Sequence, residues 1–262
     1  AIQDHVLFID ARNYYTVVDR TLNEWSEWQL KNLNAIVWLY RGETDKYFAL
    51  EYEYIRGIND AMVTCTRKAE EYQDLLPEGE AEKLYEQIRN TWKASTTICF
   101  TNLYRLLNVM DSLKEMCVAT QKNTLSYYDD RLKEQQLAFA KSVGCKTYKE
   151  CKKKFDAHVS RISKEIEACI KIINEAIWLY EKFGNGKYQD IPGLCKRASR
   201  AEIAEKQYSL TPGAYVGVTP ARDDGVNFTK RMTDIHHELL KLQSESEKLM
   251  STISMNMREM GL

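Results

Sequence analysis

The 262-residue sequence has few residues that interrupt helices, with only four prolines and eleven glycines. This scarcity argues against a turn-rich β fold, and 29% charged residues favour long, solvated helices. No apolar run approaches the roughly 18 residues of a membrane span, and no cleavable signal is visible. We therefore expect a cytoplasmic protein without membrane contact. The formal net charge of −1 provides no overall attraction to nucleic acid or anionic lipid.

Common catalytic and metal-binding motifs are also missing. The sequence has no Gly-x-Ser-x-Gly, no Walker loop and no His-Glu-x-x-His. Its seven cysteines include no Cys-x-x-Cys pair, which favours reduced thiols. Cys145, Cys151 and His158 lack zinc-site spacing. Asp234 and His237 form a single Asp-x-x-His, which falls short of the paired motifs of a di-iron bundle.

Helical periodicity dominates the middle of the chain. It predicts one amphipathic helix from Ser26 to about Gly42, a second over about 47–76, a long helical stretch after Pro77 that ends near Gly144, and a further long helix. Apolar residues recur at alternating steps of four and three in both long segments, which predicts an antiparallel hairpin within a bundle. These two stripes are Cys99, Leu103, Leu106, Met110, Leu113, Cys117, Thr120, Thr124 and Tyr127, and Phe155, Val159, Ile162, Ile166, Cys169, Ile173, Ala176, Tyr180 and Phe183.

Near the N-terminus, Val-Leu-Phe-Ile at 6–9 reads as a buried strand of the parallel-sheet kind. It must pair with a partner, with a distant extended segment, or with a sheet outside this sequence. Asp10 follows it, either as a ligand-binding residue or as a polar stop in a turn. The start at Ala1 leads us to expect a cut inside a larger protein.

The last part of the sequence contains three features. Ser199 and Glu202 form a capping box that opens a short helix. The following segment, at 210–217, contains a Pro-Gly step and is expected to be extended. The C-terminal heptad helix carries an apolar stripe suited to a partner subunit. Its candidate partner-binding residues are Met232, Ile235, Leu239, Leu242, Leu249 and Ile253.

The predicted fold class is therefore mainly α: long antiparallel helices form a helical bundle or coiled-coil hairpin. One N-terminal strand and an extended segment before the C-terminal heptad helix complete it.

One basic cluster stands out at 146–154. Its lysines are candidate contacts to a DNA backbone, although charge runs on helices are more often solvated surface, and Glu150 and Asp156 dilute this one. The cluster comprises Lys146, Lys149, Lys152, Lys153 and Lys154.

The segment Leu-Thr-Pro-Gly-Ala-Tyr-Val-Gly resembles a signature of type I restriction-modification DNA methyltransferase (modification) subunits. Its matching residues are Leu210, Thr211, Pro212, Gly213, Tyr215, Val216 and Gly217. Residues 6–12 resemble that family's closing catalytic-domain strand, residues 190–195 its lead-in to the signature, and the last helix its C-terminus. The resemblance covers about 1–43 and 187–262. Ala214 departs from it, since the family usually has arginine there.

The resemblance implies three parts: 1–43 as the end of the catalytic domain, 44–186 as a helical insertion, and 187–262 as the signature segment with a subunit-docking helix. It also implies an adenine-N6 methyltransferase subunit that uses S-adenosylmethionine. The implied partners are a specificity subunit, a restriction subunit and a second methyltransferase subunit, with DNA contacted through the complex.

The family's catalytic and cofactor motifs are missing from this sequence. Its Asn/Asp-Pro-Pro-Phe/Tyr motif needs adjacent prolines, and none of the four prolines here are neighbours. We assign no catalytic, cofactor-binding or metal residue, and expect this chain to be catalytically silent. Two alternatives stay open from the residues: a stand-alone metal-dependent helical-bundle enzyme, and a direct DNA-binding helical module.

Overall fold

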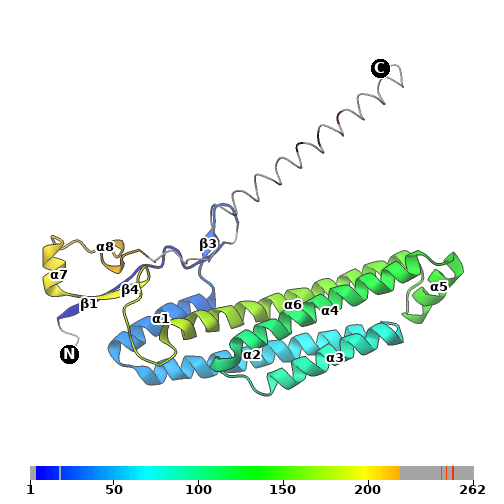
Figure 1. Cartoon of the computed structure of the whole chain (residues 1–262), viewed down its shortest axis with the longest axis horizontal. Coiled ribbons are helices and arrows are strands. Elements are labelled where there is room, and N and C mark those ends of the chain that lie inside the picture. The colour runs from blue at the N-terminus through cyan, green and yellow to red at the C-terminus, as the bar shows by residue number, and fades with distance from the viewer. Residues whose placement is uncertain (1–3, 18, 219–242, 244–245, 247–249, 251–262) are drawn as a thin grey trace. The chain divides into compact units, whose positions relative to one another are not determined.

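The computed structural model describes residues 4–17, 19–218, 243, 246 and 250. It confirms the mainly α-helical prediction (Figure 1). The long helices are α1 (Glu27–Arg41), α2 (Thr44–Gln73), α3 (Glu78–Ser95), α4 (Leu103–Asp129) and α6 (Tyr148–Phe183). A 3-10 turn, η1 (Phe100–Asn102), precedes α4, and the shorter α5 (Lys133–Ser142) lies between α4 and α6.

Four of these helices pack in a ring around one core. Helix α2 contacts α3 and α6, α4 contacts the same two helices, and α1 packs against α2 and α6. Helices α4 and α6 run antiparallel, as predicted (Figure 1). Most of the two predicted stripes is buried, but Cys99 and Tyr127, at the ends of the first, are exposed. The four-three spacing thus identified the core face of both helices.

Local signals set several helix ends. The Ser26 hydroxyl accepts a hydrogen bond from Gln29 N, and the Gln29 side chain accepts one from Ser26 N, so a capping box starts α1. Gly42 ends it at φ 77°, in the left-handed region that glycine tolerates. Thr147 caps α6 through Glu150 N at 3.2 Å.

The prediction of one uninterrupted helical stretch between Pro77 and Gly144 was wrong, because this stretch forms α3, η1, α4 and α5. The first break follows Ser95, where β-branched Thr96 and Thr97 lower helix propensity. Asn102 stabilises the turn by accepting from Cys99 N at 3.1 Å. Side chains that bond the local backbone in this way compete with helix continuation.

The N-terminal strand β1 (His5–Ile9) pairs antiparallel with β4 (Cys195–Ser199), so Phe8 lies opposite Lys196. The expectation of a parallel-type buried strand was wrong. Within β1 only Phe8 is buried, because a two-stranded ribbon shields little of either face. The alternative of pairing with a distant extended segment is confirmed. A second small pair, β2 (Thr16–Val17) with β3 (Asn23–Glu24), was not predicted.

The capped helix at 199–202 is confirmed as α7 (Arg200–Glu205), with both capping-box hydrogen bonds present. The extended conformation predicted for 210–217 was wrong, because Gly213–Val216 form a helical turn, α8. Pro212 adopts helical angles (φ −54°, ψ −41°) and its carbonyl accepts from Tyr215 N at 2.9 Å. Proline is compatible with the first turn of a helix, where its missing N–H has no partner to lose.

The buried apolar residues form two clusters. The large one fills the bundle and includes Leu194 and Cys195. The small one, which we call the signature cluster, joins β1, β4, α7 and α8 through Phe8, Ala198, Ile203, Tyr215 and Val216. Strand β4 contributes to both clusters, so it anchors the signature cluster to the bundle.

Candidate functional site: the signature cluster

The signature cluster brings together segments about 200 residues apart. The rings of Phe8 and Tyr215 stack face to face, with centroids 3.9 Å apart and planes 5° from parallel. Backbone hydrogen bonds support the stack, since Asp10 N donates to Leu194 O and Gly193 N donates to Val216 O, both at 2.8 Å. The segments around Phe8 and Tyr215 therefore meet in one place, with the helical bundle inserted between them in the sequence.

Most of the signature's conformation is set within the segment itself. The Tyr215 hydroxyl donates to the Ser209 carbonyl, and Lys206 Nζ donates to the Ala214 carbonyl. Lys206 Nζ also lies 5.0 Å from the centre of the Tyr215 ring, within cation–π range. Gly217 follows α8 at φ 70°. These contacts hold Tyr215 in the cluster and leave the side chain of Ala214 exposed.

Asp10 is held by Arg12. The carboxylate accepts from Arg12 Nε at 2.9 Å, from Nη2 at 2.6 Å and from the Arg12 backbone N at 3.1 Å. The hydrogen bonds from Arg12 lower the pKa of the Asp10 carboxyl. A Cβ at Gly213 would lie 2.6 Å from Arg12 Nη2, so a larger residue here would displace the Arg12 guanidinium from this pair. The geometry favours the structural interpretation of Asp10 over a ligand-binding one.

Three exposed apolar residues lie close in sequence to the members of the cluster. Tyr208, Leu210 and Val218 are 74%, 67% and 89% exposed. Gln207 and Tyr208 both have positive φ, 52° and 57°, which is costly for residues with a Cβ. Sequence reasoning missed Tyr208, because consecutive left-handed residues carry no signal when neither is glycine or asparagine.

The predicted lysine cluster divides into two groups. Lys152 Nζ lies 2.5 Å from Asp129 and Lys154 Nζ donates to Val143 O at 2.7 Å, so both stabilise the contact of α6 with its neighbours. Lys146, Lys149 and Lys153 are exposed. The structure thus brings three of the five lysines to the surface at the start of α6.

The six predicted partner-binding residues, from Met232 to Ile253, lie outside the described residues. The same holds for Asp234 and His237.

A buried polar network connects the segment after β1 to the bundle. Tyr14 donates to the Glu175 carboxylate, and Asn32 Nδ2 donates to Tyr14 Oη at 2.8 Å and to Glu175 Oε2 at 3.3 Å. Tyr54 donates to Asn32 Oδ1 at 2.9 Å. Burial raises the pKa of Glu175. The hydrogen bonds from Tyr14 and Asn32 fix the Glu175 carboxyl group in the bundle.

The thiols do not assemble into a metal centre. Cys99 is exposed and the other six cysteines are buried. Within the described ranges, no three His, Cys, Asp or Glu side chains come together in a metal-binding arrangement. His158 stacks on Tyr72 instead, with centroids 6.3 Å apart, and burial lowers its pKa. Across the same ranges, none of the helices has an apolar stretch long enough to cross a bilayer.

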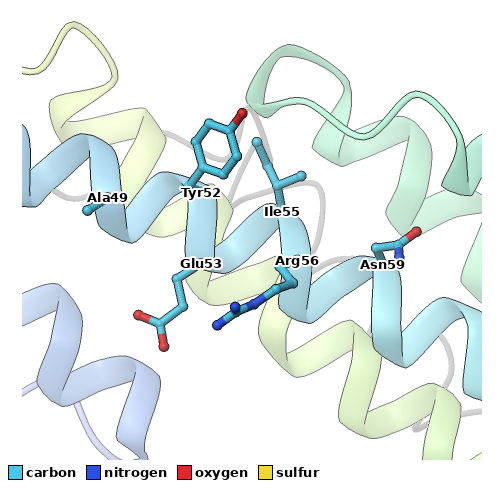
Figure 2. Close-up of a pocket in the computed structure, with 6 residues that line it drawn as sticks. All are labelled: Ala49, Tyr52, Glu53, Ile55, Arg56 and Asn59. Carbon is cyan, nitrogen blue, oxygen red and sulfur yellow. The ribbon is translucent and has the colours of Figure 1, made fainter.

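A recess of about 540 Å³ lies along α2 (Figure 2). Its lining includes Tyr52, Glu53 and Arg56, and Figure 2 shows the Glu53 and Arg56 side chains on one side of the helix. Glu53 is bound to Lys31 Nζ at 2.5 Å, which neutralises its charge locally. These lining residues form no nucleophile–base pair, so we assign no chemistry to them.

Two curated proteins are similar to parts of this chain. The type I restriction enzyme HindI methylase subunit of Haemophilus influenzae is 35% identical over 74 residues, which make up 28% of this chain and 17% of that protein. The type I restriction enzyme MjaIX methylase subunit of Methanocaldococcus jannaschii is 46% identical over 61 residues, 23% of this chain and 11% of that protein. No protein-family model and no solved structure matches. Over the matched part, the chain is related to type I restriction enzyme methylase subunits.

Proposed function

We propose that this chain is the helical, signature-bearing part of a type I DNA adenine-N6 methyltransferase (modification) subunit, and that it mediates assembly with the specificity subunit and placement on DNA. The observation that carries the proposal is the signature cluster. The two segments that resemble the family, around β1 and α8, pack against each other through Phe8 and Tyr215. Contact between two segments that both resemble the family, although they lie far apart in the sequence, supports the proposal.

The bundle fits the role of an insertion between the two segments that resemble the family. The bundle helices lie between β1 and β4 in the sequence, and these two strands pair directly. An insertion whose ends are adjacent can lengthen a protein without disturbing its host. We retain 1–43, 44–186 and 187–262 as the proposed division, although α1 shares the bundle core.

The assembly surface begins, in this proposal, at the exposed Tyr208, Leu210 and Val218. Aromatic residues are enriched in the buried centres of protein interfaces, and backbone strain is tolerated where a function needs it. Further along the sequence, the apolar stripe of the C-terminal heptad segment is proposed as a second assembly surface. An amphipathic helix of this pattern binds a groove or another helix through its apolar positions.

Methyl transfer itself belongs to other parts of the complex. S-adenosylmethionine is the cofactor proposed for the whole methyltransferase, and this chain supplies no residue to it. The restriction subunit, a second methyltransferase subunit and DNA are proposed to be reached through the assembled complex in the cytoplasm.

Deleting residues 227–262 tests the proposal. The chain is co-expressed with its cognate specificity subunit, and complex formation is measured by co-purification and size-exclusion chromatography. We expect the full chain to assemble and the deletion variant to remain free, with the helical circular dichroism of its bundle retained. Assembly that persists after the deletion would overturn the proposal.

A further inference from the structure

The end of the bundle where α4, α5 and α6 meet differs in charge from the rest. Figure 1 shows α5 at this end, where α4 finishes and α6 begins. Residues 129–154 contain eight Lys and Arg against four Asp and Glu, whereas residues 44–128 contain ten against thirteen. A nearly neutral protein therefore concentrates positive charge in one place. Local basic surfaces of this kind attract polyanions.

Three cations at this end are available to a ligand. Lys146, Lys149 and Lys153 are exposed, and within the described part of the chain none of them forms an ion pair. Lys152 and Lys154 bond to α4 and to the end of α5 and so fix the start of α6. The exposed lysines therefore project from a rigid helix start, which limits the entropy lost on binding.

A pocket of about 380 Å³ lies at the same end, with Tyr127, Tyr128, Arg131, Gln135 and Phe139 in its lining. Tyr128 stacks on Phe139 with centroids 3.9 Å apart, which fixes the wall. Tyr127 is 55% exposed, and the Arg131 guanidinium lies 4.4 Å from the centre of its ring. The guanidinium thus covers one face of the ring, and the outer surfaces of this stacked pair are flat surfaces on which a planar ligand can stack.

We infer that this end of the bundle binds a single nucleic-acid strand, with phosphates on Lys146, Lys149 and Lys153 and an unstacked base against Tyr127 and Arg131. Single-strand sites combine these two elements, a basic track and aromatic stacking surfaces. An acidic protein could also bind the three lysines, but it would not require the exposed ring of Tyr127. The inference deepens the placement on DNA in the proposed function, but it depends only on residues of the bundle.

The test uses fluorescence anisotropy of the full chain with a labelled single-stranded oligonucleotide and with its duplex. Tyr127→Ala is expected to weaken single-strand binding by about fivefold or more, as for the loss of one base–aromatic stack, with a smaller effect on the duplex. Tyr85→Ala is the matched control, because Tyr85 is a 54% exposed tyrosine on α3. Equal effects of the two substitutions would contradict a stacking role for Tyr127.

A second variant tests the phosphate contacts. Replacing Lys146, Lys149 and Lys153 by Ala is expected to reduce the slope of log K against log salt by about 2, from about 0.7 for each lost single-strand phosphate contact. A triple Ala variant at the exposed Lys93, Lys164 and Lys171 carries the same charge change and should leave the slope unchanged.

The absence of salt-dependent oligonucleotide binding would overturn the inference. The inference would also be overturned if the triple lysine variant no longer bound the specificity subunit but still bound the oligonucleotide. The three lysines would then contact protein and not nucleic acid. Deleting residues 227–262 should leave oligonucleotide binding unchanged. Failure of the assembly proposal and failure of this inference are thus read from separate measurements.

Discussion

Phe8 and Tyr215 stack face to face with their ring planes only 5° apart, although they lie about 200 residues apart in the sequence. Both side chains are 5% exposed, and their cluster has only five buried members. In such a small core each aromatic ring supplies a large share of the buried apolar area. The stack therefore contributes much of the apolar contact between β1 and α8.

Replacing Phe8 by Ala should open the signature cluster without unfolding the bundle. Replacing a buried phenylalanine by alanine lowers the free energy of unfolding by about 3–5 kcal/mol. We expect a cluster of only five buried residues to open when it loses this much stabilisation. Hydrogen exchange should show loss of protection in β1 and β4 while α2 and α6 stay protected.

Tyr215→Phe provides the matched control, because it keeps the stack and removes only the hydrogen bond to Ser209. Its expected cost is about 1 kcal/mol. Protection of β1 and β4 that survives Phe8→Ala would show that the stack does not hold the cluster together.

Gly213→Ala should separate Arg12 from Asp10. The added Cβ would lie 2.6 Å from Arg12 Nη2, and the flexible guanidinium is the group that moves. The pKa of Asp10, now lowered by Arg12, should rise toward its ordinary value, with little change in the free energy of unfolding.

Nuclear magnetic resonance titration of the Asp10 carboxyl measures this change. In the wild-type protein the stabilisation from a lowered carboxyl pKa is present above the unfolded-state pKa and is lost as the pH falls through the folded-state value. Gly79→Ala, at a glycine without a positive φ where an added Cβ would meet no other atom within 4 Å, should leave the Asp10 titration unchanged. An unshifted Asp10 in Gly213→Ala would refute the close approach of α8 to Arg12.

Glu175→Gln should alter how stability depends on pH. Burial raises the folded-state pKa of Glu175, so the folded protein holds this proton more tightly than the unfolded chain does. The wild-type free energy of unfolding therefore falls as the pH rises from the unfolded-state pKa through the folded-state pKa. The amide carries no charge to bury, and its oxygen can still accept from Tyr14.

Urea denaturation across this pH range measures the effect. The stability of Glu175→Gln relative to wild type should increase with pH and then level off above the folded-state pKa. A difference between the two proteins that does not vary with pH would contradict the assigned burial of the charge.

One thiol should react rapidly in the native protein. Cys99 is exposed and the other six cysteines are buried. Burial raises the pKa of Cys117 to about 12 and that of Cys151 to about 11, which lowers the fraction of reactive thiolate further. A thiol reagent should label one equivalent quickly and the remaining six only after unfolding. Cys99→Ser should abolish the fast phase, and a fast phase that persists would show that another thiol is accessible.

The bundle was predictable because its signals are local and repeated. The four-three spacing of Leu103, Leu106 and Met110 identified a face that is buried, and Ser26 and Gly42 marked the ends of α1. The signature cluster was less accessible to sequence reasoning. Its resemblance to a family could be read, but the helical turn after Pro212 could not, because a Pro-Gly step fits both a turn and a helix start.

The pairing of β1 with β4 was also not predicted from the sequence. Residues 195–199 show no clear alternation of apolar and polar side chains, so β4 gave no strand signal, and its partner β1 lies about 190 residues away. The pocket beside Tyr127 and Arg131 was also not predicted from the sequence. Tyr127 continues the apolar spacing of α4, yet the bundle ends beside it and leaves its ring exposed.

The affinity of the full chain for its cognate specificity subunit tests the central claim most directly. Isothermal titration calorimetry would compare wild type with Leu239→Asp, at a proposed partner-binding position, and with Leu132→Asp, at a leucine that is 73% exposed at the far end of the bundle. We predict that Leu239→Asp weakens binding by about 30-fold or more, the effect of losing an interface hot spot, and that Leu132→Asp binds like wild type. Equal affinities for all three proteins would contradict the assembly role.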